Sequence, residues 1–142
     1  RENIHGELDT VALPMAKALI AANGGDAALA AETYQGVAHL PTMVSIGCPL
    51  VTSRIGGLAA RTAGLVKEAE NEFQRSIAFC ESKGMLPELA WSCSDLAELL
   101  VANDGDHARA QELDEQALDI ANSIGMKPLI RRILSRREIL KA

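Results

Sequence analysis

Residues 58–87 have the sequence LAARTAGLVKEAENEFQRSIAFCESKGMLP, which predicts one helix, a tight turn at a glycine and a longer second helix. Small and apolar side chains recur every three or four residues on both sides of Gly64, as they do on one face of a helix. The second predicted helix ends at Lys83-Gly84, and Pro87 then begins the next one, in agreement with the usual preferences at helix ends. This stretch therefore predicts a helical hairpin.

The same hairpin pattern occurs once downstream and once upstream of this stretch. Downstream, in residues 96–128, Gly125-Met126 follows Gly84-Met85 by 41 residues, but Leu96 follows Leu58 by only 38. The turn at 103–106 is therefore predicted to be three residues longer. The upstream copy repeats four landmarks at one offset of 39, namely Leu19 and Leu58, Gly25 and Gly64, Ala30 and Ala69, and Tyr34 and Phe73. This period lies near those of helical-hairpin repeats, about 34 for tetratricopeptide units and about 40–47 for HEAT or armadillo units.

A single hairpin cannot bury its apolar face, so repeated hairpins stack and share one core. The sequence therefore predicts an all-α fold of antiparallel helical hairpins, stacked as a tetratricopeptide-like α-solenoid in a single domain over 1–142. Three hairpins are expected at about 10–40, 50–84 and 87–125, followed by a capping helix at about 128–141. The chain is 48% hydrophobic but only 3% aromatic, a composition that suits tightly packed helices with a core of alanine, leucine and isoleucine.

Several boundaries and packing features can be predicted within this scheme. Asp9-Thr10 is expected to cap a helix at 11–23, and Asp26 a helix at 27–40. Residues 42–49 are predicted to form a connector or the start of the next helix, which covers about 50–63. Gly56 and Gly57 weaken that helix intrinsically, so they indicate close approach by a neighbouring element. The remaining helices are expected at 66–83, from Pro87 onward, at 107–124 and at 129–140. The last of these has Leu129, Ile133 and Leu140 on one side.

The net charge of −5 is unevenly distributed. Residues 67–126 hold 13 acidic and 4 basic side chains, whereas residues 127–142 hold 6 basic and 1 acidic. This acidic body argues against direct binding of nucleic acid. No apolar run is long enough to cross a membrane, and residues 1–10 do not resemble a signal peptide. Three cysteines without C-x-x-C spacing predict free, buried thiols in a cytoplasmic protein.

Two segments of the last predicted hairpin resemble a known family. PELAWSCSDLAELL at 87–100 and GDHARAQELDEQALDIANSIGMKPLIRR at 105–132 are similar to the tetratricopeptide-like region of large bacterial signalling proteins. These proteins are class III adenylate/guanylate cyclases and LuxR-type ATPase transcriptional regulators. Matching positions include Gly64, Ala69, Phe73, Asp95, Leu96, Ala97, Gly105, Asp106, Arg109, Ala110, Ala117, Gly125 and Met126. The resemblance covers about residues 10–140 and implies the fold, while the catalytic and ATPase modules of those proteins lie in other parts of their chains.

The residues themselves indicate no catalytic centre, cofactor site or metal site. The phosphate-binding pattern G-x-x-x-x-G-K-[ST] and a cyclase-like set of metal-binding carboxylates are both absent, as is the full W-x-x-L-G-x-x-Y repeat signature. His5, Glu7 and Asp9 alternate near the start of the chain, but metal sites need ligands that structure brings together. The chain is therefore predicted not to be an enzyme.

The first helix of each hairpin is the best candidate for a binding surface, because these helices commonly form the concave face of repeat solenoids. The candidate groove residues, which lie on these helices and off the core stripe or at its edge, are Arg54, Arg61, Trp91, Ser94 and Asp95. The expected partner is a protein, a peptide or a second copy of the chain, and an alternative is a small-molecule effector held in the same groove. Two further alternatives stay open: Trp91 packs between repeats, and the arginine-rich last helix is either a solvated cap or docks on an acidic surface.

Overall fold

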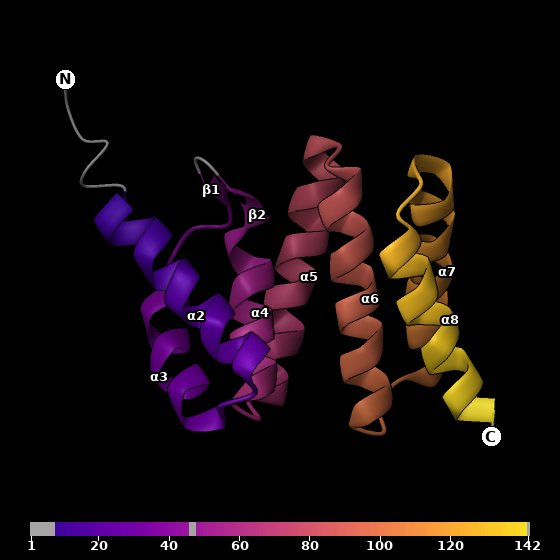
Figure 1. Ribbon diagram of the computed structural model, residues 1–142, viewed down its shortest axis with the longest axis horizontal. Coiled ribbons are helices and arrows are strands. Elements are labelled where there is room, and N and C mark those ends of the chain that lie inside the picture. Colours follow the sequence, from indigo (N-terminus) through magenta and orange to yellow (C-terminus); the bar gives the residue numbers. More distant parts are fainter. Residues whose placement is uncertain (1–7, 46–47, 142) are drawn as a thin grey trace. The chain divides into compact units, whose positions relative to one another are not determined.

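The computed structural model describes residues 8–45 and 48–141, and their fold is all-α (Figure 1). The elements are a π-helical turn η1 (Leu8–Ala12), α2 (Leu13–Gly24), α3 (Ala27–Val37), β1 (Val44–Ser45), β2 (Cys48–Val51), α4 (Thr52–Thr62), α5 (Val66–Lys83), α6 (Leu86–Ala102), α7 (His107–Ile124) and α8 (Lys127–Lys141). The chain divides into two compact units, residues 1–79 and 80–142, and the division falls within α5. The single domain expected over 1–142 stays a prediction.

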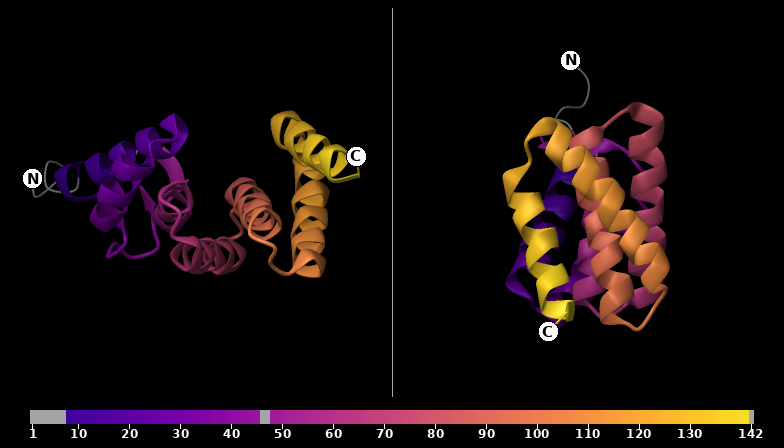
Figure 2. Two further views of the ribbon diagram at one scale, coloured as in Figure 1. Left: turned by 90° about the horizontal axis from the view of Figure 1, so that it is seen from below. Right: turned by 90° about the vertical axis from the view of Figure 1, so that its right-hand side faces the viewer.

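In the first unit, α2, α3 and α4 pack against one another, as Figures 1 and 2 show. The predicted cap of α3 is confirmed, since the Asp26 carboxylate accepts a hydrogen bond of 3.0 Å from the Leu29 amide. The predicted cap of the first helix is wrong. The regular helix α2 begins only at Leu13, and Ala12 precedes it without a side-chain cap.

The connector at 42–49 contains a feature that the sequence did not predict, a two-stranded antiparallel hairpin of β1 and β2. As a result α4 begins at Thr52 and not near residue 50. The Thr52 hydroxyl donates to the Pro41 carbonyl at 2.7 Å and accepts from the Met43 amide at 3.0 Å. These bonds tie the start of α4 to the chain that leads into β1.

Close packing between α4 and α5 depends on the two glycines singled out in the sequence. A Cβ atom on Gly57 would lie 2.5 Å from Cε1 of Phe73, and one on Gly56 would lie 3.3 Å from Cδ of Glu72. Phe73 is fully buried and Tyr34 nearly so, and both belong to the core. The expectation that these glycines permit close approach is therefore confirmed.

In the second unit, α6 packs on α7 and α7 packs on α8 (Figure 2). The predicted 41-residue period reappears in the backbone hydrogen bonds. The Met85 amide donates to Cys80 at 3.0 Å, and the Met126 amide donates to Ala121 at 2.8 Å. The intervening Gly84 and Gly125 both have a left-handed φ, +66° and +77°, so the same glycine-terminated turn ends α5 and α7.

The interior contains many alanines at points of helix contact. Alanines that are at most 2% exposed are Ala18, Ala21, Ala30, Ala59, Ala60 and Ala69 in the first unit, and Ala90, Ala97, Ala110, Ala117 and Ala121 in the second. Because an alanine side chain is small, neighbouring helix backbones can lie close together. The low aromatic content predicted such tightly packed helices. Cys80 and Cys93 are free and buried, as expected; the side chain of Cys48 lies outside the described residues.

Candidate functional site

The candidate site is a cluster of charged side chains in the second unit, which we call the ion cluster: Asp95 and Glu98 from α6, Asp114 from α7, and Arg132 and Arg136 from α8. Helical spacing creates it, because Asp95 and Glu98 lie three residues apart and the two arginines lie four apart. Each pair therefore lies on one face of its helix. The C-terminal basic segment thus meets the acidic segment within the same chain.

Arg132 is the centre of the cluster on the α6 side. Its Nη2 lies 3.0 Å from Oδ1 of Asp95 and also pairs with Oε2 of Glu98, and its guanidinium lies 5.6 Å from the ring centroid of Trp91. Burial lowers the pKa of Arg132, but the carboxylates of Asp95 and Glu98 outweigh this effect and raise the pKa above its ordinary value. Arg132 is therefore a permanent cation stacked on the only tryptophan.

Arg136 connects the same cluster to α7. Its Nη2 pairs with Oδ1 of Asp114 and lies 3.4 Å from the Ser94 hydroxyl, while its Nη1 lies 3.5 Å from Oε2 of Glu98. Burial raises the pKa of Asp114, and the charge of Arg136 opposes that rise. Two arginines of α8 are thus held by acidic groups on both of the preceding helices.

The five residues predicted for a groove have different environments. Ser94 and Asp95 were expected off the core stripe or at its edge, but both are fully buried, so this expectation is wrong. They contact the α8 arginines and are covered, whereas Trp91 is partly exposed. Arg54 and Arg61 lie on α4 in the first unit and are also partly exposed. Trp91, Ser94 and Asp95 are therefore brought together.

Sequence reasoning missed the residues that complete the cluster, namely Glu98, Asp114, Arg132 and Arg136. Of the two alternatives left open for the last helix, the solvated cap does not describe Arg132 and Arg136, whose side chains are 31% and 13% exposed and pair with carboxylates of this unit. Leu140, predicted to share the apolar face of Leu129 and Ile133, is instead 59% exposed. The only sequence signal for the cluster was the opposite charge of residues 67–126 and 127–142.

Cys93, which lies on α6 near this region, has the properties of a structural thiol. Burial raises its pKa to about 12, with a further contribution from the charge of Glu81. Its Sγ lies 3.6 Å from Oε1 of Gln116 on α7. Because the thiolate is the reactive form, this cysteine is unreactive at neutral pH.

The first unit contains a separate buried carboxylate, Glu72 on α5. Its side chain is 7% exposed and pairs with Nη1 of Arg75 at 3.1 Å. Burial raises the pKa of Glu72, while Arg75 and a hydrogen bond with Ser53 oppose the rise. The folded state therefore binds this proton more tightly than the unfolded state does.

This raised pKa predicts that Glu72 ionisation opposes folding at neutral pH. Below the pKa that Glu72 has in the unfolded chain, Glu72 is protonated in both states and this unfavourable contribution is absent. The free energy of unfolding then falls as the pH rises through the pKa that Glu72 has in the folded protein. The slope is at most about 1.4 kcal/mol per pH unit. Urea unfolding of wild type and Glu72→Gln between about pH 4 and 7 measures this difference. The exposed Glu68→Gln is the matched control, and an equal pH-dependent difference in that variant would contradict the prediction.

Comparisons of the chain with known protein families, with curated proteins and with solved structures find no match. Within residues 8–45 and 48–141, no three His, Cys, Asp or Glu side chains are grouped so that they could hold a metal ion. His5 and Glu7 lie outside that range. Among the described helices, none has the length and apolar character that crossing a membrane requires.

Proposed function

We propose that this chain is a tetratricopeptide-like α-solenoid that serves as a non-catalytic interaction or scaffolding module of a bacterial signalling or regulatory protein. The recurring hairpin carries the proposal, because the same glycine turn follows α5 and α7 with the same backbone hydrogen bonds. Repeat proteins of this kind commonly bind peptides or partner helices on the surface lined by the first helix of each hairpin. A protein or peptide is therefore the proposed partner.

Residue type and exposure indicate which side chains on those helices would contact the partner. Trp91 on α6 is partly exposed and stacks on Arg132, and Arg54 and Arg61 on α4 are partly exposed too. Tryptophan and arginine are enriched among the residues that dominate binding energy at interfaces. Ser94 and Asp95 are covered, so their proposed role is to hold the α8 arginines and thereby orient Arg132 over the indole.

The proposal is tested by retention of a partner from the host lysate, identified by native mass spectrometry. We expect Arg54→Glu/Arg61→Glu and Trp91→Ala each to lower retention at least tenfold, because truncating or reversing such residues costs more than about 1.4 kcal/mol. The matched control is Lys67→Glu/Lys83→Glu, which makes the same charge change at exposed positions of α5, the second helix of its hairpin. Thermal melts of all variants establish that each is folded.

Two results would count against this proposal. Normal retention by both groove variants would exclude the first-helix surface. Equal loss in the groove double variant and the lysine control would show that the overall charge, and not the surface on α4, governs binding.

A further inference from the structure

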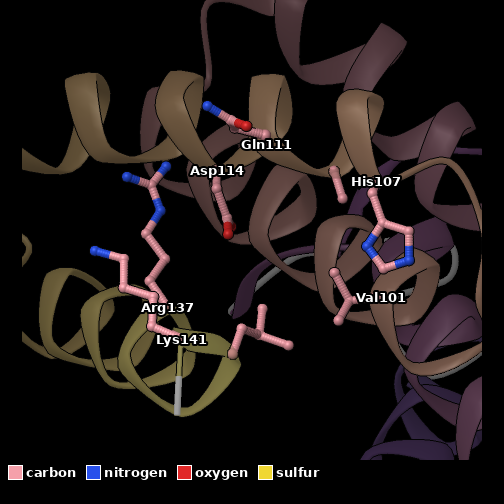
Figure 3. A pocket seen from close by; sticks show the side chains of 8 residues that line it. Val101, His107, Gln111, Asp114, Arg137 and Lys141 are labelled. Atoms are coloured by element: carbon pink, nitrogen blue, oxygen red, sulfur yellow. The ribbon is translucent and has the colours of Figure 1, made fainter.

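The second unit contains a cavity of about 440 Å³, a size typical of sites for small molecules. It is distinct from the exposed surface around Trp91. Its lining residues are Val101 from α6, His107, Ala110, Gln111 and Asp114 from α7, and Arg137, Leu140 and Lys141 from α8. Figure 3 shows Arg137 and Lys141 on α8 across the cavity from His107 and Val101. Polar groups thus share the wall with an apolar surface.

The charge in this cavity is predominantly positive. Arg137 and Lys141 lie four residues apart on α8 and so occupy one face of that helix. Asp114 is the only acidic lining residue, and its carboxylate already pairs with Arg136. Arg137 lies close enough to lower the pKa of Asp114, but burial and Arg136 have larger effects on that group. The cavity therefore contains more cationic charge than its own carboxylate balances.

Arg137, which lines the cavity, has one atom with an unmet hydrogen-bonding requirement. Nη2 of Arg137 is buried and has no hydrogen-bond acceptor among the described residues. A buried donor without an acceptor is costly, and for a charged group the cost is greater. Nη2 itself is covered, but the Arg137 side chain as a whole is partly exposed. An anionic oxygen in the cavity would therefore meet the accessible edge of this guanidinium and balance its charge, in the geometry that carboxylates and phosphates match.

We propose that this cavity binds a small organic anion, with a carboxylate or phosphate group on a compact apolar body. Arg137 contacts the anionic oxygens, and Lys141 adds a second positive charge. Gln111 and His107 provide further polar contacts, and the apolar body lies against Val101, Ala110 and Leu140. This site is independent of the interaction surface proposed above, because it requires neither Trp91 nor the α4 arginines.

Isothermal titration of the full chain with benzoate, phenyl phosphate and the neutral benzamide tests this proposal. Each probe has the same ring, so the comparison isolates the charged group. We expect at least one anion to bind with a Kd of about 1 mM or tighter, and benzamide to bind at least about tenfold more weakly. The tighter of the two anions identifies the preferred head group. Failure of both anions to bind below about 10 mM, or equal binding of benzamide, would overturn the proposal.

Three variants locate the binding to this cavity. Arg137→Gln is expected to weaken the anion at least about tenfold, because a charge-assisted hydrogen bond is lost. Lys141→Gln lies at an exposed position near the end of α8, where it does not disturb the fold, and is expected to weaken binding about threefold. Arg131→Gln makes the same charge change as Arg137→Gln at an exposed position that does not line the cavity. Equal weakening by Arg131→Gln, or unchanged affinity in both cavity variants, would place the binding elsewhere and overturn the proposal.

Discussion

Replacement of Arg132 with glutamine is expected to destabilise the second unit by about 3–5 kcal/mol, the usual cost of removing one partner from a buried ion pair. The side chain of Asp95 is fully buried, and Arg132 Nη2 lies 3.0 Å from its Oδ1. Without this guanidinium the buried Asp95 side chain loses this ionic contact. Glu98 loses an ion pair in the same variant, and the stacking on Trp91 disappears.

Urea unfolding followed by Trp91 fluorescence measures this effect, because the only tryptophan belongs to the same unit. The matched control is Arg131→Gln, which changes the adjacent, exposed arginine and is expected to alter stability by no more than about 0.5 kcal/mol. The double variant Asp95→Asn/Arg132→Gln is expected to be more stable than Arg132→Gln alone, since Asp95→Asn removes the buried charge that Arg132 balanced. Additive losses in the double variant would show that the two residues do not interact.

The second large effect is expected for Gly57→Ala, which should destabilise the first unit by about 2 kcal/mol. The new Cβ would lie 2.5 Å from Cε1 of Phe73 and within 3 Å of two further ring atoms. The ring is fully buried, so relief requires a shift of packed atoms, and overpacking of this kind costs about 3 kcal/mol. Alanine recovers only about 1 kcal/mol through its better helix propensity.

Thermal and urea unfolding followed by circular dichroism measure the Gly57→Ala effect. The control is Gly24→Ala in α2, where a Cβ meets no atom within 4 Å and the substitution is expected to be neutral or slightly stabilising. Adding Phe73→Leu to Gly57→Ala should cost less than Phe73→Leu costs in wild type, because the smaller side chain leaves room for the Cβ. Equal stability of Gly57→Ala and Gly24→Ala would contradict the close approach of α4 and α5.

The helices whose ends carry local signals were predicted well from the sequence. The predicted bounds of α5 and α7 agree with the structure, because Asp106 caps α7 and a glycine follows each helix. Compared with the hairpin at 58–83, the downstream hairpin has three additional residues before its second helix, and the sequence predicted all of them in the turn. In the structure most of them lengthen α6, which ends at Ala102. The β1–β2 pair was missed because a two-residue strand has too few positions for an alternating pattern.

The ion cluster was less predictable for a different reason. Its partners lie far apart in sequence, since Arg132 follows Asp95 by 37 positions. A polar residue beside an apolar stripe is ordinarily exposed, so Asp95 was placed at the edge of the core. Its contact Arg132 lies on α8, whose position no local pattern encodes. The charge imbalance indicated attraction between the two segments but not which side chains meet.

The alanine-rich interior has a consequence for how this protein can diverge. Positions such as Ala59, Ala69 and Ala117 are fully buried. At such a position the only smaller residue is glycine, which weakens a helix by about 1 kcal/mol, and every larger residue crowds a neighbouring backbone. Single substitutions there are therefore selected against, whether the new side chain is smaller or larger. The interior can drift only through paired changes, in which one helix gains volume as its neighbour loses it, so the helix contacts should change more slowly than the surface.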